Sequence, residues 1–266
     1  MTTAPDPARL VDLDRYPLLD PVALVPVVTA ARAGLRDDGV AGLVGFLRPD
    51  AVAELCTEAL ELEPLGHHSV VQGTPYLGLP DPDAPPGDPR AALVDNALTA
   101  IVYDRFPTDS PMRALYEWEP LRAFVEAVLD RGTLHRYADP LGALNVAVMR
   151  AGDELGWHFD MTDFVVSIAL QASEVGGDFE SATRIRSDDD PSLERVAGVL
   201  AGDRAPVRSV AMEPGTLLLF EGRHSLHRVT PVAGERPRLV ALLAYDTKPG
   251  TDSTELLKAV RYGRTA

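Results

Sequence analysis

Two side chains that bind metal ions in many proteins stand two residues apart in the middle of the chain. His158 and Asp160 flank Phe159, and an apolar run, 164–170, follows them closely. If this segment is extended, the alternation of side chains along a strand places the imidazole and the carboxylate on one face. Together they would supply two of the three protein ligands of a 2-His-1-carboxylate site, in which other positions of a divalent metal ion stay open. The spacing therefore predicts a metal site that one further histidine would complete.

The later part of the chain offers two histidines as the third ligand. His224 and His227 lie three residues apart, so an extended backbone would point them to opposite faces, and at most one would join the first pair. His227 precedes the segment 229–232, which is typical of a strand and turn, and a cluster of arginines follows it. We favour His227 as the ligand and expect His224 at the rim of the site.

The composition limits the classes of function. A chain of 266 residues with 45% hydrophobic and 24% charged residues has the size and balance of a globular protein with a large core. The first residues show no signal-peptide pattern, and no apolar run reaches the length of about 20 residues that spans a bilayer. The single Cys56 fits a reducing cytoplasm, and a net charge of -15 argues against nucleic-acid or anionic-membrane partners. We predict an acidic, cytoplasmic protein with neither kind of partner.

Helical patterns dominate the first half of the chain. Apolar residues at helical spacing predict helices over 20–37, 49–62 and 112–130. Pro120 should break or kink the last of them. A short strand is expected over 40–47, and a loosely held arm over 1–20.

The segment 79–90 differs from its surroundings in composition. It carries five prolines and three aspartates, which exclude a helix or a central strand. We interpret it as a surface loop, with a lid over an active site as the alternative.

After Gly132 the pattern changes to short β-like runs separated by Gly, Pro and Asp, as in a meander or a double-sheet barrel. The runs are 144–149, 156–160, 164–170, 178–185, 207–211, 216–220, 225–229 and 239–245. Short helices are expected over 192–200 and 253–260. We predict a single domain over 1–266, of mainly β or α+β class. Its parts are a helix-rich N-terminal part (1–135), a β-barrel core (136–250) and a C-terminal helix (251–266).

The order of these residues resembles the Fe(II)/2-oxoglutarate-dependent dioxygenase family. His158-x-Asp160, then His227, then an arginine follow the order of that family. A Gly-Gly-Asp turn at 176–178 and a Pro-Gly strand ending in Phe at 214–220 add to the likeness. The resemblance implies a double-stranded β-helix, a jelly-roll, cupin-like core with N-terminal helices packed against it. It also implies Fe(II) at these three ligands, with 2-oxoglutarate and dioxygen (O2) as cosubstrates.

In such a site a basic residue should hold the far carboxylate of 2-oxoglutarate. A buried carboxylate without a partner is costly, and the planar, permanently charged fork of arginine suits it. Arg236 and Arg238 both follow His227 within the range that the family shows, and they share one strand face. Pro237 suggests that the strand begins at about residue 238, and members of the family with an Arg-Pro-Arg pattern use the second arginine. We therefore choose Arg238 as the cofactor-binding residue. Arg236 is interpreted as a surface turn residue.

Three segments, 158–167, 220–223 and 245–250, resemble a small bacterial branch of the family. That branch hydroxylates or halogenates free amino acids and related building blocks of secondary metabolism. Its halogenases replace the carboxylate ligand by a small residue, whereas this chain keeps Asp160. The resemblance therefore implies hydroxylation of an unactivated C–H bond of an amino-acid-like small molecule, with 2-oxoglutarate converted to succinate and CO2. A related desaturase or cyclase is the alternative, and a homodimer is left open.

Other polar residues are candidates by type only. Candidates to bind the carboxylate or ammonium group of an amino acid are Arg105, Arg136, Asp139, Asp163 and Asp246. Each is more often a structural or solvated charge. Asn145 would bind the cosubstrate or cap a strand end, and Trp157 is expected to pack. No catalytic residue is predicted beyond the metal centre.

Two other classes of protein compete with an oxygenase. A metal-dependent hydrolase with the same three ligands on zinc would leave the arginine after His227 unexplained, and no separate general base stands out. A non-catalytic, cupin-like binding module would keep the fold without needing an intact ligand set.

Overall fold

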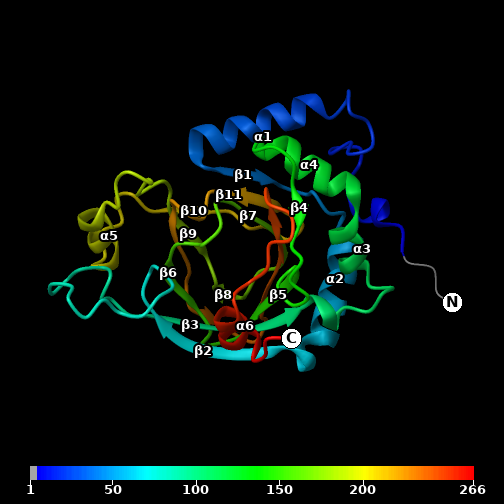
Figure 1. Cartoon of the computed structure of the whole chain (residues 1–266). Coiled ribbons are helices and arrows are strands. Elements are labelled where there is room, and N and C mark those ends of the chain that lie inside the picture. The colour runs from blue at the N-terminus through cyan, green and yellow to red at the C-terminus, as the bar shows by residue number, and fades with distance from the viewer. Residues whose placement is uncertain (1–4) are drawn as a thin grey trace.

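Most strands of the chain form one strongly curled antiparallel sheet, which appears as an open ring in Figure 1. The computed structural model describes residues 5–266. The strands are β1 (Val40–Leu43), β2 (His67–Gly73), β3 (Val94–Val102), β4 (His135–Arg136), β5 (Leu144–Met149), β6 (Leu155–His158), β7 (Val165–Gln171), β8 (Val175–Gly176), β9 (Phe179–Ala182), β10 (Arg208–Val210), β11 (Leu217–Phe220), β12 (Leu226–Val229), β13 (Val232–Ala233), β14 (Arg238–Leu243) and β15 (Tyr245–Asp246). Neighbours in the main sheet follow the order β1-β11-β7-β14-β5-β3-β6-β12-β9-β10, and β2 pairs with β3. Two small sheets pair β13 with β8 and β15 with β4.

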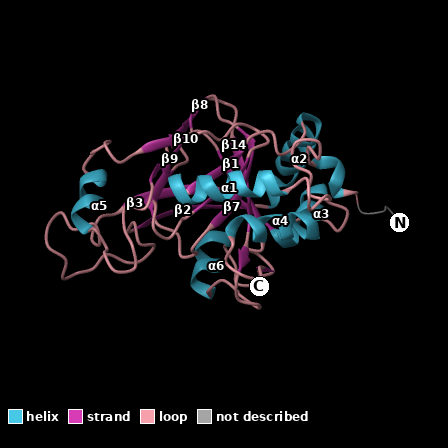
Figure 2. Cartoon of the chain, turned by 90° about the horizontal axis from the view of Figure 1, so that it is seen from above, coloured by secondary structure: helices cyan, strands magenta, loops and turns pink. Residues whose placement is uncertain are grey.

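Helices cover one side of this curled sheet and close one of its ends. They are α1 (Val25–Asp38), α2 (Pro49–Leu62), α3 (Pro111–Glu117), α4 (Glu119–Leu129), α5 (Leu193–Leu200) and α6 (Glu255–Tyr262), with short 3-10 helices at Pro7–Leu10, Glu63–Leu65 and Tyr103–Arg105. α1 contacts β1 and α4, and α2 contacts β7; Figure 2 shows α1 lying across the sheet. α5 stands on the opposite side, and α6 packs on β2 and β3. Within residues 5–266 no helix is long and apolar enough to cross a membrane.

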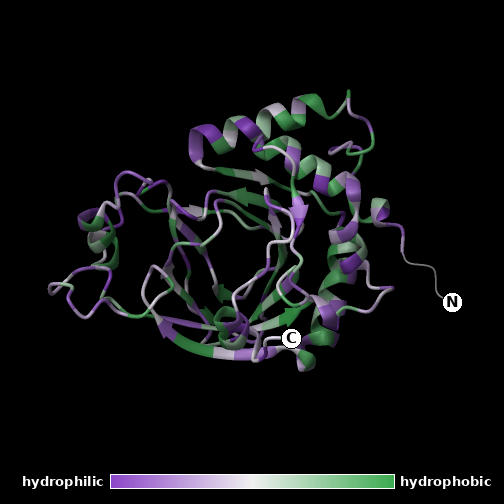
Figure 3. Cartoon of the chain, viewed as in Figure 1, coloured by the Kyte–Doolittle hydropathy of each residue, from purple (hydrophilic) through white to green (hydrophobic). Residues whose placement is uncertain are grey.

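Strand β5 shows how the barrel wall is built. All of its residues are buried. Val146 and Val148 pack in the core beneath the helices, whereas Ala147 and Met149 pack in a second cluster inside the barrel. A strand that is buried on both faces has a continuous apolar sequence. This is why the strand predicted over 144–149 coincides with β5; Figure 3 shows the hydrophobic colour on strands of the ring.

The predicted break in the third helix is confirmed. α3 ends at Glu117, and α4 begins at Glu119 with Pro120 in its first turn. A proline there costs no hydrogen bond, because the first N–H groups of a helix have no partner inside it. The chain therefore turns at Trp118 and packs both helices on the same core.

The prediction of a loosely held arm over 1–20 is wrong for the residues that the structure describes. Leu10 and Val11 are fully buried, and Val11 forms a β-bridge with Leu47. These side chains belong to the core between the sheet and the helices. Residues 1–4 lie outside the described part of the chain.

Two long strands of the first half were not predicted. β2 pairs with β3 along its whole length, and β3 pairs with both β5 and β6 in the main sheet. Polar residues such as Asn96 and Thr99 interrupt the apolar pattern of β3, so neither alternation nor an apolar run marks it. The main sheet thus extends into the span that the sequence predicts to be helix-rich.

The proline-rich segment 79–90 lies beside α5. Residues 84–88, 91 and 92 line a groove together with residues 197, 200 and 201, and Leu79 is 93% exposed. None of the described residues that line the cavity at Asp160 belongs to this segment. The structure therefore favours the surface loop over the lid.

Candidate metal centre

Three predicted residues meet at one end of the barrel. His158 is the last residue of β6, and its antiparallel partner in β12 is His227. Asp160 follows β6 and turns back beside both rings. The ligand atoms of the three side chains all lie within 4.8 Å of one another, and the imidazole centroids are 4.3 Å apart. A single metal ion could therefore contact all three side chains.

Backbone carbonyls orient both imidazoles. Nδ1 of His158 lies 2.8 Å from the carbonyl oxygen of Gly156, and Nδ1 of His227 lies 2.9 Å from that of Ser225. A carbonyl accepts a hydrogen bond only, so each Nδ1 carries the proton and each Nε2 keeps a free lone pair. Hydrogen bonds of this kind fix the ring and the tautomer of metal-binding histidines.

The charge states of the three groups suit a divalent ion. Burial and the charge of His227 lower the pKa of His158 to about 4. Burial alone would raise the pKa of Asp160, but the charges of His227, His158 and Arg261 together outweigh it and lower that pKa to about 2. At neutral pH His158 is therefore neutral and Asp160 is ionised, as metal binding requires.

One oxygen atom of Asp160 has no donor in the described part of the chain. Oδ2 is buried, lies 3.2 Å from Nε2 of His227, and accepts no hydrogen bond. A buried carboxylate oxygen without a donor is costly, and a bound cation would remove that cost. Two imidazole nitrogens and one carboxylate fit Fe(II) among the possible divalent ions.

Metal affinity should depend on pH through His227. Burial lowers the pKa of His227, but the carboxylate of Asp160 outweighs this and raises the pKa above its ordinary value of 6.5. A proton on His227 competes with the metal, so Mn(II) affinity should increase as the pH rises and level off above that pKa. The metal-free protein should show the opposite trend and lose the stability of the His227–Asp160 pair over the same rise. Mn(II) titrations and unfolding temperatures from about pH 6 to about pH 9 measure both effects.

The matched control for this titration is His68→Gln. His68 lies 2.9 Å from Asp153 and outside the three-residue group, so its loss should leave the pH dependence of Mn(II) binding unchanged. A Mn(II) affinity that does not vary with pH would contradict the proton competition at His227.

Gly222 lies directly against the carboxylate of Asp160. Its carbonyl oxygen accepts a hydrogen bond from the backbone N–H of Asp160 at 3.1 Å. A Cβ atom at this position would stand 2.1 Å from Oδ2 of Asp160, closer than any real contact. Glycine at this position therefore gives the carboxylate its place beside the histidines.

Gly222→Ala should weaken metal binding by about 10- to 100-fold, the range for residues that support metal ligands. The new methyl group would push the carboxylate away from the two Nε2 atoms. Mn(II) titration measures the loss. Gly73→Ala is the control, because a Cβ there would meet nothing closer than 3.9 Å. Equal affinities of both variants would show that Asp160 moves aside without leaving the metal.

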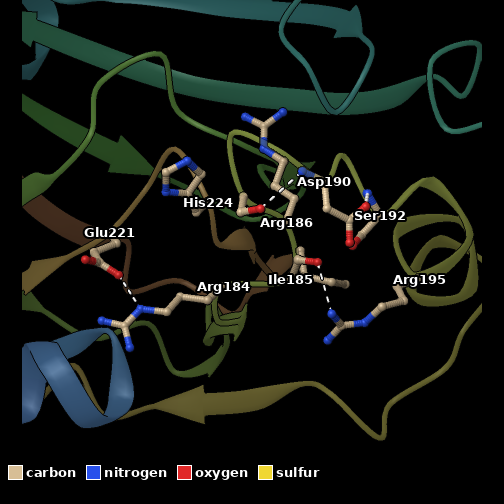
Figure 4. A pocket seen from close by; sticks show the side chains of 9 residues that line it. Arg184, Ile185, Arg186, Asp190, Ser192, Arg195, Glu221 and His224 are labelled. Atoms are coloured by element: carbon tan, nitrogen blue, oxygen red, sulfur yellow. Dashed lines mark hydrogen bonds and ion pairs between the residues drawn. The ribbon is translucent and has the colours of Figure 1, made fainter.

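His224 is not part of this group. It lines a separate pocket with Arg184, Arg186 and Arg195, shown in Figure 4. Its Nε2 lies 3.1 Å from Oδ1 of Asp188. Of the two candidates, the structure thus places only His227 beside the first pair.

The two candidate arginines differ sharply in environment. Arg238 begins β14 inside the barrel, is 6% exposed, and has Met149 Sδ at 3.9 Å as its polar neighbour. Burial lowers the pKa of Arg238 to about 10, against the opposing charge of Asp178. Arg236 is exposed and donates a hydrogen bond to the carbonyl oxygen of Ala172 at 2.9 Å. Of the two, Arg238 is therefore the buried arginine, and it has no ion-pair partner among residues 5–266.

The Gly-Gly turn makes room for this arginine. Gly176 and Gly177 both have a positive φ, of 65° and 68°. A Cβ at Gly177 would stand 3.1 Å from Cδ of Arg238, and one at Gly176 would meet the carbonyl oxygen of Pro231 at 2.0 Å. Glycine is required at both positions for conformation and space.

Asp160 opens into a cavity of about 460 Å³ at the mouth of the barrel, called the mouth cavity below. Its described lining residues are Leu77, Tyr137, Gly142, Asn145, Asp160–Val166, Arg223, Leu242–Lys248, Thr251–Thr254, Leu257, Arg261 and Tyr262. Asn145 is 6% exposed, and its Oδ1 has no hydrogen-bond partner among residues 5–266. The volume is within the range of small-molecule sites.

Most of the charged residues that were candidates by type have structural roles. Arg136 donates to the carbonyl oxygens of Tyr116 and Glu117, and Asp139 accepts the backbone N–H of Leu141.

Asp163 pairs with Arg223, and Arg105 lies 3.9 Å from Asp104. Asp246 remains as a carboxylate of the mouth cavity. Trp157 packs against α5, as expected. Arg261 of α6 also lines the mouth cavity, and the sequence motifs did not point to it.

Comparisons with known proteins agree with this geometry. A family model described as Halogenase D matches residues 104–258, more than half of the chain. The comparison with curated proteins finds no match. AviO1 from Streptomyces viridochromogenes Tue57 is similar with a TM-score of 0.57 at 21% identity, over 85% of this chain and 97% of that chain. An oxidoreductase of the 2OG-Fe(II) oxygenase family from Burkholderia pseudomallei gives 0.52 at 18% identity, over 84% and 92%. The epimerase SnoN, in complex with Fe3+, alpha ketoglutarate and nogalamycin RO, gives 0.54 at 17% identity, over 85% and 84%.

These likenesses confirm the predicted fold. The curled sheet with its helices has the double-stranded β-helix architecture of the 2OG-Fe(II) oxygenases. Together with the family match, they confirm the resemblance to Fe(II)/2-oxoglutarate-dependent oxygenases that the sequence motifs indicate.

Proposed function

The chain belongs to the Halogenase D family, and from this membership and the geometry of its site we propose that it hydroxylates a small molecule with Fe(II) and 2-oxoglutarate. The observation that carries hydroxylation over halogenation is Asp160. A carboxylate stands beside both histidines, in the place that a halide ligand would need. Halogenases of the branch that the sequence resembles have a small residue there.

In this proposal His158, Asp160 and His227 hold Fe(II) through two Nε2 atoms and one carboxylate. The bound metal, with 2-oxoglutarate and dioxygen, supplies the oxidising power, and succinate and CO2 are the coproducts. The protein holds the carboxylate ionised and His158 neutral, and Phe179 and Phe220 pack on the ring of His227. These apolar rings keep water away from one side of the centre.

We assign Arg238 and Asn145 to 2-oxoglutarate. Register pairs Arg238 with Met149 and Leu242 with Asn145, so by strand alternation both polar side chains lie on the inner face of the barrel. The guanidinium would accept the far carboxylate as a bidentate pair, which suits a buried arginine. The side-chain amide of Asn145 lies nearer the mouth of the barrel, where the end of 2-oxoglutarate opposite to the far carboxylate would lie.

We propose an amino-acid-like substrate. The mouth cavity has charged side chains of both signs as well as polar and apolar ones. A small zwitterionic molecule needs the charged groups for its two ends and the apolar ones for its aliphatic part. The cytoplasmic location stays a prediction, and a homodimer is left open.

A two-step experiment tests the proposal. Fe(II) and 2-oxoglutarate added without oxygen should give a weak visible charge-transfer band, and Zn(II) should not. In air, at least one member of a panel of free amino acids should stimulate succinate formation and gain one oxygen atom by mass. No band and no succinate with any amino acid would contradict the proposal.

The same assay separates the alternatives. A desaturase or cyclase product would lose two hydrogen atoms instead of gaining oxygen. A zinc hydrolase would show activity with Zn(II) and none that depends on 2-oxoglutarate, and a binding module would show neither.

A further inference from the structure

The C-terminal helix presents an arginine to the mouth cavity. Thr254, Leu257 and Arg261 are spaced for one face of a helix, and all three line the cavity that contains Asp160. Lys258 and Tyr262 form the buried face of α6. Helix geometry and the cavity wall therefore agree on the direction of the Arg261 side chain.

Arg261 has no counter-ion in the part of the chain that the structure describes. It is partly buried, and it makes no hydrogen bond or ion pair with any residue from 5 to 266. By contrast, Arg223 in the same cavity pairs with Asp163. Arg261 and the metal-site residue Asp160 line the same cavity. The guanidinium therefore belongs to the space into which the metal site opens.

A buried ion pair holds the helix in place. Nζ of Lys258 lies 2.6 Å from Asp252 and 3.4 Å from Asp139, whose side chain is fully buried. The hydroxyl of Thr254 accepts the backbone N–H of Leu257 at 3.2 Å and caps the first turn. Arg261 is therefore carried by a fixed helix, so little ordering is needed when a ligand binds.

An unpaired guanidinium in a partly buried position is unfavourable until an anion meets it. Two anions are expected in the mouth cavity and the barrel behind it: 2-oxoglutarate and the acid group of the substrate. Arg238 lies deep inside the barrel, with Met149 as its neighbour, whereas Arg261 lies at the mouth. The two arginines are thus placed for different molecules.

We propose that Arg261 binds the carboxylate of the substrate and makes the enzyme specific for molecules with a free carboxylate. This inference depends on the proposed function and adds to it the residue that selects the acidic end of the substrate. Arginine is suited to this role by its bidentate fork. A neutral molecule of the same shape would leave the guanidinium unpaired and bind weakly.

The test compares each common amino acid with its own carboxamide on the enzyme loaded with Fe(II) and 2-oxoglutarate. Binding is followed without oxygen by thermal shift, and turnover in air by succinate formation. The acid should exceed its amide by about 50-fold in kcat/KM, as expected for loss of one partner of a desolvated charge pair. Arg261→Gln should raise the KM for the amino acid by about 50-fold and remove the preference for the acid. The KM for 2-oxoglutarate should stay within about twofold of that of the unmodified protein, because Arg238 is intact.

Two variants serve as controls. Arg264→Gln removes a nearby arginine that pairs with Asp104, and it should change neither KM. Arg261→Lys keeps the charge without the fork and should restore part of the preference.

The outcomes are distinguishable. If no acid binds or reacts better than its amide, or if Arg261→Gln raises the KM for 2-oxoglutarate instead, the role of Arg261 is wrong. The proposed function then still stands, provided that the charge-transfer band and 2-oxoglutarate-dependent succinate formation are present. Loss of both would overturn the proposed function and this inference with it.

Discussion

Asp160→Gly is expected to abolish hydroxylation, with a loss of more than about 100-fold in 2-oxoglutarate-dependent turnover. The carboxylate is one of three side chains whose donor atoms converge within 4.8 Å, and its removal leaves the metal with two imidazoles. Even residues that only support metal ligands are worth about 10- to 100-fold, so a ligand should be worth more. Mn(II) titration and succinate formation in air measure the two consequences separately.

The matched control is Asp188→Asn. This carboxylate also lies beside a histidine, at 3.1 Å from Nε2 of His224, which lines the separate pocket of Figure 4, so Mn(II) affinity and turnover should be unchanged. The products of Asp160→Gly formed in the presence of chloride should also be analysed for halogenation. The space that the carboxylate leaves lies beside the metal and could take a halide. Hydroxylation by Asp160→Gly at the rate of the unmodified protein would refute the ligand role.

Arg238→Met is expected to raise the concentration of 2-oxoglutarate needed for half-maximal activity by about 100-fold or more. Loss of one partner of a buried, hydrogen-bonded charge pair costs about 3 kcal/mol, which corresponds to about 100-fold in affinity. The ligand-free protein should be as stable as before or more stable, because methionine removes a 6%-exposed charge that has no counter-ion. Isothermal titration with 2-oxoglutarate and thermal unfolding test both parts.

Arg236→Gln is the control for this substitution. Its guanidinium is exposed and bound to the carbonyl oxygens of Ala172 and Ser173, so 2-oxoglutarate affinity should stay unchanged. An effect confined to Arg236→Gln would reverse the assignment. A large loss of stability in Arg238→Met would instead show that Arg238 supports the fold.

The meeting of the two histidines could be predicted because their geometry is local in two strands. His158 ends β6 and His227 is the second residue of β12, and alternation along an extended backbone is enough to select one face for each. The choice between Arg236 and Arg238 followed from Pro237, which directly precedes β14, and from the Arg-Pro-Arg pattern of the family. The structure adds that Arg238 is buried and Arg236 is exposed, which alternation alone could not show; the binding of 2-oxoglutarate by Arg238 stays a prediction.

Other parts of the molecule depend on packing between distant segments. β3 became a central strand because it bridges β5 and β6, although its own sequence is interrupted by polar residues. Leu10 and Val11 are buried because they pack in the core between the sheet and the helices, where Val11 bridges to Leu47. Arg261 lies on a helix whose docking face is fixed by Lys258 and its two acidic partners. Neither the spacing nor the composition of the sequence indicates where these residues lie in the fold.

Gly222 and Asp160 have a consequence for the divergence of related sequences. The carboxylate of Asp160 occupies the volume that any side chain at position 222 would fill. Relatives that keep the acidic residue should therefore be confined to glycine at the second position, whereas those with a small residue in place of the acid should tolerate larger side chains there. The two positions should change together in evolution. A lineage that passes from hydroxylation to halogenation would lose the acid first and only then be free to vary the glycine.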